Sequence, residues 1–160
     1  MPTAKLGTAE LHGFMQAHDI AGEILHLEVP TPTVASAALA VQANEEQIIK
    51  SILFLVDGQP VLVIACGTSN IGRRPIADLF QVGKKRIKLA TPEMVLEISG
   101  YEVGAMPPFG HRQPLTTLID RRVLDLSEAY AGGGAENALL RLNPQEIMRV
   151  TAAKVLDLLE

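Results

Sequence analysis

The pattern of apolar positions along the chain predicts helices that alternate with strands. Apolar and aromatic residues recur at helical spacing near the N-terminus, which predicts a helix over residues 8–18. A looser alternation predicts a strand over residues 22–29. Thr33 is a suitable N-cap for a second helix, and Asn44 followed by Gln47 predicts a short helical turn.

A β-hairpin is the strongest local signal in the sequence. Residues 48–56 and 61–66 are almost wholly apolar, and between them stands the pair Asp57-Gly58, which accepts the positive φ angles of a tight turn. Successive rather than alternate positions are apolar in both segments. Strands of that kind are covered on both faces, so we expect this hairpin at the centre of a sheet.

Beyond the hairpin, helices and strands continue to interleave. The pattern predicts helices over 75–81, 91–100 and from 143 onward, strands over 86–90, 115–120, 128–131 and 137–142, and an irregular segment over 100–114. The hairpin makes at least part of the sheet antiparallel. We therefore expect an α+β fold with a mixed, barrel-like β-sheet and flanking α-helices.

Composition narrows the class of protein. The 160 residues predict a single domain over 1–160, and a net charge of −4 argues against a protein that coats DNA or RNA nonspecifically. The single cysteine, Cys66, excludes a disulfide within the chain and favours a cytoplasmic location. No apolar run approaches the length of a membrane helix, and the four histidines lack metal-ligand spacing, so we expect no membrane, metal or cofactor.

Lys50 is the first candidate functional residue. It stands next to Ser51 where the first hairpin strand begins, and an extended chain would place it on one face with Ile48 and Ile52. A buried ammonium is costly unless it is paired or used. The alternative is that Lys50 ends a short helix, favours the negative end of its dipole, and reaches water.

Two glycine-rich segments are further candidates. Residues 100–111 contain three glycines and the pair Pro107-Pro108, a composition that suits either a functional loop with free amides or a surface crossover. The run Gly132-Gly133-Gly134 suits either a hairpin turn or a place where a ligand lies against bare backbone.

Other features carry less information. Cys66 suits a small buried filler better than a nucleophile. Short basic clusters at 73–74, 84–88 and 121–122 suit either solvated faces or contacts to a few phosphates.

Taken in this order, these features resemble the YbaK family of aminoacyl-tRNA deacylases, which includes the editing domain inserted in bacterial prolyl-tRNA synthetases. The matching pieces are residues 47–54, 100–111, Asp120, 131–134 and 140–146. The resemblance covers roughly residues 20–155. Members of the family that remove cysteine carry a serine at the position of Gly132, and the synthetase-type domains use a histidine near the last glycine segment, where this chain has none over 129–142.

The resemblance implies a function and a set of site residues. It implies hydrolysis of the ester between a small amino acid, such as alanine or cysteine, and proline tRNA, with the acceptor end of the tRNA as partner and prolyl-tRNA synthetase as a second candidate partner. Lys50 would anchor the substrate, and backbone amides near Gly104 and Gly110 would form an oxyanion hole. The expected substrate-binding residues are Ser51, Gly100, Tyr101, Pro107, Pro108, His111, Asp120, Gly132, Gly133 and Gly134.

Two other functions remain open at this stage. The same pocket could bind an aminoacyl end or a free amino acid without cleaving it. Alternatively, Cys66 could serve as the nucleophile of a thiol hydrolase, which needs an exposed sulfur and a neighbouring base.

Overall fold

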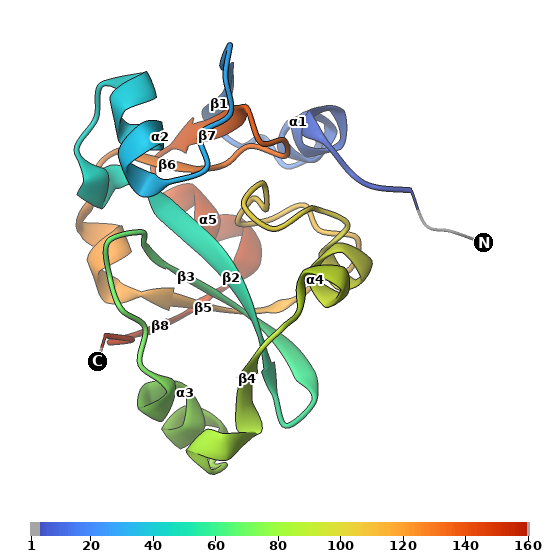
Figure 1. The fold of residues 1–160 in the computed structure, drawn as a ribbon, viewed down its shortest axis with the longest axis vertical. Coiled ribbons are helices and arrows are strands. Elements are labelled where there is room, and N and C mark those ends of the chain that lie inside the picture. Colours follow the sequence, from blue (N-terminus) through green and yellow to red (C-terminus); the bar gives the residue numbers. More distant parts are fainter. Residues whose placement is uncertain (1–3, 160) are drawn as a thin grey trace.

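The computed structural model describes residues 4–159, whose strands form two sheets (Figure 1). The larger sheet has the strand order β4-β2-β3-β5-β8, and the smaller one has the order β1-β7-β6. The elements are α1 (Thr8–Ala17), β1 (Gly22–His26), α2 (Val34–Val41), β2 (Ile49–Val56), β3 (Gln59–Cys66), α3 (Arg73–Phe80), β4 (Ile87–Leu89), α4 (Pro92–Ser99), β5 (Thr116–Asp120), β6 (Ala129–Gly132), β7 (Ala138–Leu142), α5 (Gln145–Thr151) and β8 (Lys154–Leu156).

The predicted hairpin lies at the centre of the larger sheet. Strands β2 and β3 pair antiparallel from Ile49 opposite Cys66 to Val56 opposite Gln59. Asp57 and Gly58 have φ angles of 49° and 85°, as the tight turn requires. Strand β4 flanks β2 in antiparallel pairing, and β5 runs parallel to β3, so the sheet is mixed as predicted.

The expectation of a barrel-like sheet is wrong in one respect, because the sheet does not close. Strands β4 and β8 remain the two edges of the larger sheet. The smaller sheet meets β2 through a bridge between Ile48 and Tyr130, just before β2 begins. One bridge is too short a ladder to join the two sheets into a continuous wall.

The sheets are covered by three groups of buried apolar side chains. One face of the larger sheet packs with the loop after α4 and with α5, through residues such as Leu53, Ile64, Tyr101, Met106 and Ile147. The other face packs against α3 and the C-terminal segment, through Phe54, Val63, Ile76, Ile87 and Leu158. A third group, which we call the α2 cluster, consists of Ala37, Ala38, Ile48, Tyr130 and Leu139.

Helix ends follow the predicted caps in two places. The hydroxyl of Thr33 accepts a hydrogen bond from the amide of Ser36 at 3.0 Å, and that of Thr91 accepts one from Met94 at 3.3 Å. Other boundaries differ from the prediction. The strand expected over 22–29 ends at His26. Helix α3 begins at Arg73 rather than at residue 75, and the cap that follows it is Gln81, in the left-handed conformation, rather than Gly83.

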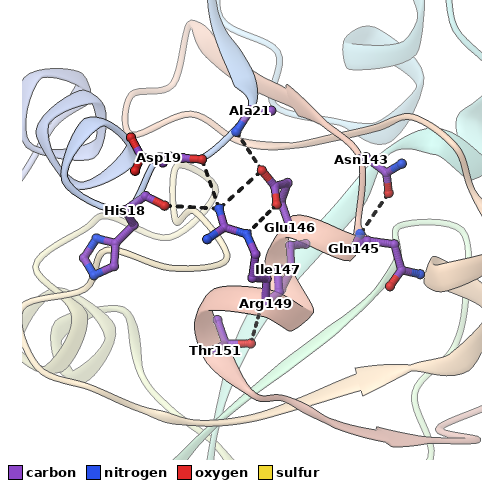
Figure 2. Close-up of polar contacts among 9 residues, drawn as sticks. All are labelled: His18, Asp19, Ala21, Asn143, Gln145, Glu146, Ile147, Arg149 and Thr151. Carbon is purple, nitrogen blue, oxygen red and sulfur yellow. Dashed lines mark hydrogen bonds and ion pairs between the residues drawn. The ribbon is translucent and has the colours of Figure 1, made fainter.

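The C-terminal helix α5 is fastened to the connection between α1 and β1 (Figure 2). Glu146 accepts a hydrogen bond from the amide of Ala21 at 2.7 Å and pairs with Arg149 at 2.8 Å. The guanidinium of Arg149 also donates to the carbonyls of His18 and Asp19, each at 3.1 Å. These bonds join α5 to the segment between α1 and β1. Within residues 4–159, none of the helices is both long and apolar enough to cross a membrane.

Candidate active site

Lys50 lies in β2, opposite Ala65 of β3. Because β2 begins at Ile49 and the preceding helical turn ends at Gln47, the alternative placement of Lys50 at a helix end is wrong. The side chain is half-buried, and no hydrogen bond or ion pair joins its ammonium to any residue from 4 to 159. An ammonium in this setting is available to a ligand.

Gly67 makes room for the Lys50 side chain. A Cβ atom at Gly67 would lie 3.6 Å from Cε of Lys50 and only 2.6 Å from Cγ2 of Val34, the first residue of α2. The amide of Gly67 donates to the carbonyl of Ile48 at 2.7 Å. The lysine stem therefore lies beside a bare stretch of backbone near the start of α2. Sequence analysis missed Gly67, although the register set by the Asp57-Gly58 turn already places it opposite Ile48.

The glycine run packs directly on the loop that follows α4. A Cβ atom at Gly132 would lie 2.2 Å from the carbonyl oxygen of Met106, and the amide of Gly134 donates to the carbonyl of Ala105 at 2.9 Å. The run also connects β6 to β7, so it is a hairpin connection. Glycine is required at Gly132 because the backbone of Met106 leaves no room for a side chain. Gly133 is equally confined, because its Cβ atom would lie 2.6 Å from the carbonyl carbon of Ala138.

Lys50 and Gly132 border the same group of side chains. Gly132 pairs with Leu139, a member of the α2 cluster. Ile48, which belongs to the same cluster, precedes Lys50 by two residues, so the alternation of an extended chain places both on one side. The structure thus places the start of β2 and Gly132 at the border of the α2 cluster, and Gly132 in turn contacts the carbonyl of Met106, which belongs to the core group on the other face of the larger sheet.

The segment after α4 is a closed, hydrogen-bonded loop. Tyr101 is fully buried, and its hydroxyl donates to the carbonyl of Gly110 at 3.3 Å. Burial raises the pKa of Tyr101 to about 12. Pro107 and Pro108 are buried as well. Gly100 ends α4 with a φ of 89°, and its carbonyl accepts a hydrogen bond from Leu6 at 2.7 Å. The loop is therefore held in one shape.

His111 holds the turn within this loop. Its Nε2 lies 2.7 Å from the carbonyl oxygen of Pro107, and its ring meets the edge of Tyr101 with centroids 6.2 Å apart. Desolvation lowers the pKa of His111 to about 4. The ring is then neutral at pH 7, and Nε2 carries the proton because a carbonyl oxygen only accepts. His111 positions the loop and does not act as a charged group.

The amides of Gly104 and Gly110 are free within the described residues. Neither donates a hydrogen bond to any residue from 4 to 159. Gly104 is exposed, with open space where a Cβ atom would lie, whereas a Cβ atom at Gly110 would lie 3.2 Å from the Phe14 ring. Both have positive φ angles, 87° and 77°. Two unbonded amides in a rigid loop are suitable donors to an oxyanion.

Asp120 has a different environment from Lys50. It is fully buried, and its carboxylate accepts hydrogen bonds from the amide of Leu158 at 2.9 Å and from the amide and guanidinium of Arg122 at 3.2 and 3.3 Å. The bond from Leu158 joins the end of β5 to the C-terminal segment. Any part that Asp120 plays in substrate binding is therefore indirect.

Ser51 and Cys66 have buried polar atoms on the sheet. The Ser51 hydroxyl has no hydrogen-bond partner among residues 4–159, and because it neighbours Lys50 along β2, it lies on the opposite side of the strand. Cys66 is 8% exposed, and burial raises the pKa of its thiol, with the charges of Asp120 and Glu46 adding to the effect. A buried thiol with a raised pKa is a poor nucleophile, so this environment does not favour a thiol hydrolase.

Two surface hollows lie elsewhere. One of about 550 Å³ adjoins the β2–β3 turn, and one of about 330 Å³ lies between α3, β5 and the end of α5. None of the residues predicted to form the site lines either hollow.

Comparison with known proteins identifies the family. The model of the aminoacyl-tRNA editing domain matches residues 28–150. A solved structure described as "a putative trans-editing enzyme for prolyl tRNA synthetase" is 31% identical, covers 96% of both chains, and superposes with a TM-score of 0.88.

Curated relatives extend this result. The proline–tRNA ligase of Streptococcus gordonii is 29% identical over 124 residues, which are 76% of this chain and 20% of the ligase. The protein YwhH of Bacillus subtilis is 25% identical, and the match covers 83% of each chain. The chain thus spans about a fifth of the ligase and most of YwhH. With a family model that matches most of its length, this chain belongs to the family of aminoacyl-tRNA editing domains.

Proposed function

We propose that this protein hydrolyses the ester bond of a mischarged aminoacyl-tRNA as a separate editing enzyme. The observation that carries the proposal is the ammonium of Lys50, which lacks a partner among residues 4–159 and borders the α2 cluster in a member of the editing family. The acceptor end of the tRNA would lie between α2, the glycine run and the loop after α4. Ser51 and Tyr101 would support this pocket from the sheet and from within the loop.

Lys50 would anchor the substrate by its charge. A lysine ammonium is a compact, strongly hydrated cation that suits the carbonyl or the terminal ribose and phosphate of the substrate. The room beside Gly67 lets its stem reach the α2 border without distortion of the strand.

The loop amides would stabilise the reaction intermediate. Water attacks the ester carbonyl carbon, and the carbonyl oxygen becomes an oxyanion that accepts hydrogen bonds from Gly104 and Gly110. One such donor contributes roughly 3 kcal/mol to the transition state, or about two orders of magnitude in rate. The bond from the carbonyl carbon to the ribose oxygen then breaks, the amino acid leaves as a carboxylic acid, and the ribose oxygen takes a proton.

The proton transfers would be assisted by the substrate. His111 is neutral and bonded to Pro107, and Cys66 is buried, so neither is placed to act as a general base. A neighbouring hydroxyl of the terminal ribose would instead orient the water and relay its proton. An aminoacyl ester is already activated, so this assistance suffices without a protein nucleophile.

Alanine on proline tRNA is the substrate that we favour. Members of the family that remove cysteine carry a serine where this chain has Gly132, and a Cβ atom there would lie 2.2 Å from the Met106 oxygen. The wall of the proposed pocket at Gly132 therefore differs from that of the family members that remove cysteine. The relatives that are named for prolyl-tRNA synthetase support proline tRNA and that synthetase as partners.

A panel of charged tRNAs tests the proposal. Proline tRNA charged with alanine, cysteine or proline is incubated with the protein, and the release of labelled amino acid is followed alongside binding. We expect release from the alanyl form and little from the prolyl form. Binding without release of any amino acid would contradict hydrolysis and assign the chain to the non-catalytic class.

A further inference from the structure

A short stretch of the chain has a charge opposite to that of the whole. Residues 73–88 contain six of the 14 basic residues and one of the 18 acidic ones, so this stretch carries +5 although the chain carries −4. The six cations are exposed on α3, on the turn that follows it and on β4. We call them the basic strip, which consists of Arg73, Arg74, Lys84, Lys85, Arg86 and Lys88.

The basic strip is not explained by the stability of the fold. Of its members only Arg86 is paired within residues 4–159, with Asp57 at 3.3 Å. Arg73 and Arg74 lie in the first turn of α3, where the helix dipole disfavours cations. Lys84 and Lys85 are adjacent and repel each other. By contrast, Arg122 forms ion pairs with Asp120 and Asp157. Such pairing is what a cation that stabilises the fold is expected to show.

Helix α3, which carries Arg73 and Arg74 of the strip, lies on the same side of the larger sheet as Lys50. Helix α3 covers the face that carries Phe54, and alternation along β2 places Lys50 on that face, whereas the side chain of Lys88 in the edge strand β4 points to the other face with Leu55. The segment that leads into α3 begins at Gly67, beside the Lys50 stem. Lys88 pairs with Leu55, five residues along β2 from Lys50, which corresponds to about 17 Å of strand. In Figure 1, α3 and β4 lie at the lower end of β2, opposite α2.

We propose that the basic strip binds the phosphate backbone of the RNA helix whose aminoacylated end is held at Lys50. Exposed lysines and arginines bind phosphates without reading sequence and release counterions as they do so. The separation along β2 lets one RNA molecule reach both places. This inference rests on the proposed function and adds a second contact region to it.

Two double variants and a matched control test the inference. R73Q/R74Q and K84Q/K85Q each remove two charges from the strip, and K5Q/R141Q removes two exposed charges that are paired with Glu102 and Glu23 on other elements. Affinity for uncharged proline tRNA is measured across a salt series. We expect each strip variant to bind about tenfold more weakly at low salt and to lower the salt slope by about 1 to 2, while the control changes less than twofold.

A second measurement separates this inference from the proposed function. Hydrolysis of alanyl-adenosine, which has no phosphate, is expected to be the same in the strip variants and the wild type. Uncharged tRNA is not hydrolysed, so the binding result stands whether or not the protein is a deacylase. If the strip variants bind RNA with the affinity and salt slope of the wild type, the inference is overturned. It is also overturned if K5Q/R141Q loses as much RNA affinity as the strip variants. Retained RNA affinity with loss of binding to prolyl-tRNA synthetase would assign the strip to that protein instead.

Discussion

Lys50 and Asp120 are charged residues near the ends of two strands that flank β3, yet their surroundings differ. The Asp120 carboxylate is fully buried and accepts three hydrogen bonds, two from Arg122 and one from the amide of Leu158 that joins β5 to the C-terminal segment. The Lys50 ammonium is half-buried and has no partner among residues 4–159. A charge that maintains the fold is satisfied by the protein itself, whereas a charge left unsatisfied is available to a ligand. We therefore expect loss of Asp120 to affect stability and loss of Lys50 to affect activity.

The largest stability effect is expected from Asp120→Ala. Removal of the carboxylate leaves the buried amide of Leu158 without its acceptor, so the free energy of unfolding should fall by about 3 kcal/mol. Asp120→Asn keeps one acceptor oxygen and should cost about 1 kcal/mol. Denaturant titration measures both. Equal stability of the alanine variant and the wild type would show that these hydrogen bonds are not a structural requirement.

The desolvated ring of His111 should make the stability of the protein depend on pH. In the unfolded chain it binds a proton below its ordinary pKa of 6.5, whereas in the fold it binds one only below about 4. Between these values the unfolded state takes up more protons, so stability should fall by up to about 3 kcal/mol as the pH drops from 6.5 to 4. Denaturant titrations at several pH values measure this slope. In His111→Gln the slope should be flatter, and an unchanged slope would remove the histidine from the explanation.

Gly132→Ser tests whether the glycine run is held by contact. The added Cβ would lie 2.2 Å from the Met106 oxygen, so the loop must shift. We expect the free energy of unfolding, measured by thermal or denaturant unfolding, to fall by about 2 kcal/mol. Gly104→Ala is the control, because the space there is open and only the positive φ is strained, which costs about 1 kcal/mol. A serine variant as stable as the wild type would mean that the loop accommodates a side chain.

Cys66→Ala should have the smallest effect. The thiol is buried and its raised pKa disfavours the thiolate, so deacylation by this variant should equal that of the wild type. Stability should fall by about 1 kcal/mol through lost packing. A large loss of activity with stability retained would restore the thiol hydrolase as a candidate.

Much of the region around Lys50 could be predicted from local sequence. The Asp57-Gly58 turn fixes the hairpin register, and this register places Lys50 in a strand and Gly67 opposite Ile48. The helix caps at Thr33 and Thr91 are also local signals. These features depend on residues close together in the chain, which is why the pattern of the sequence was sufficient for them.

Contacts between distant segments could not be predicted in the same way. Strand β8 has three residues, two of them exposed, so it lacks the alternation that marks a strand. The packing of Gly132 on the Met106 carbonyl is a contact between backbones, and it leaves no apolar pattern. Among residues 4–159, backbone pairing joins the two sheets only at the bridge between Ile48 and Tyr130, so the larger sheet stays open. This bridge joins two segments that are far apart in the sequence, and the pattern of neither segment predicts it.

The most direct test of the central claim is the hydrolysis of alanyl-tRNA(Pro) by Lys50→Ala. We predict that kcat/KM falls by about 100-fold while the free energy of unfolding changes by less than about 1 kcal/mol, because the ammonium has no partner among residues 4–159. Lys50→Arg, which keeps the charge on a larger planar group, should recover part of the rate. Wild-type hydrolysis by a well-folded Lys50→Ala protein would contradict the account.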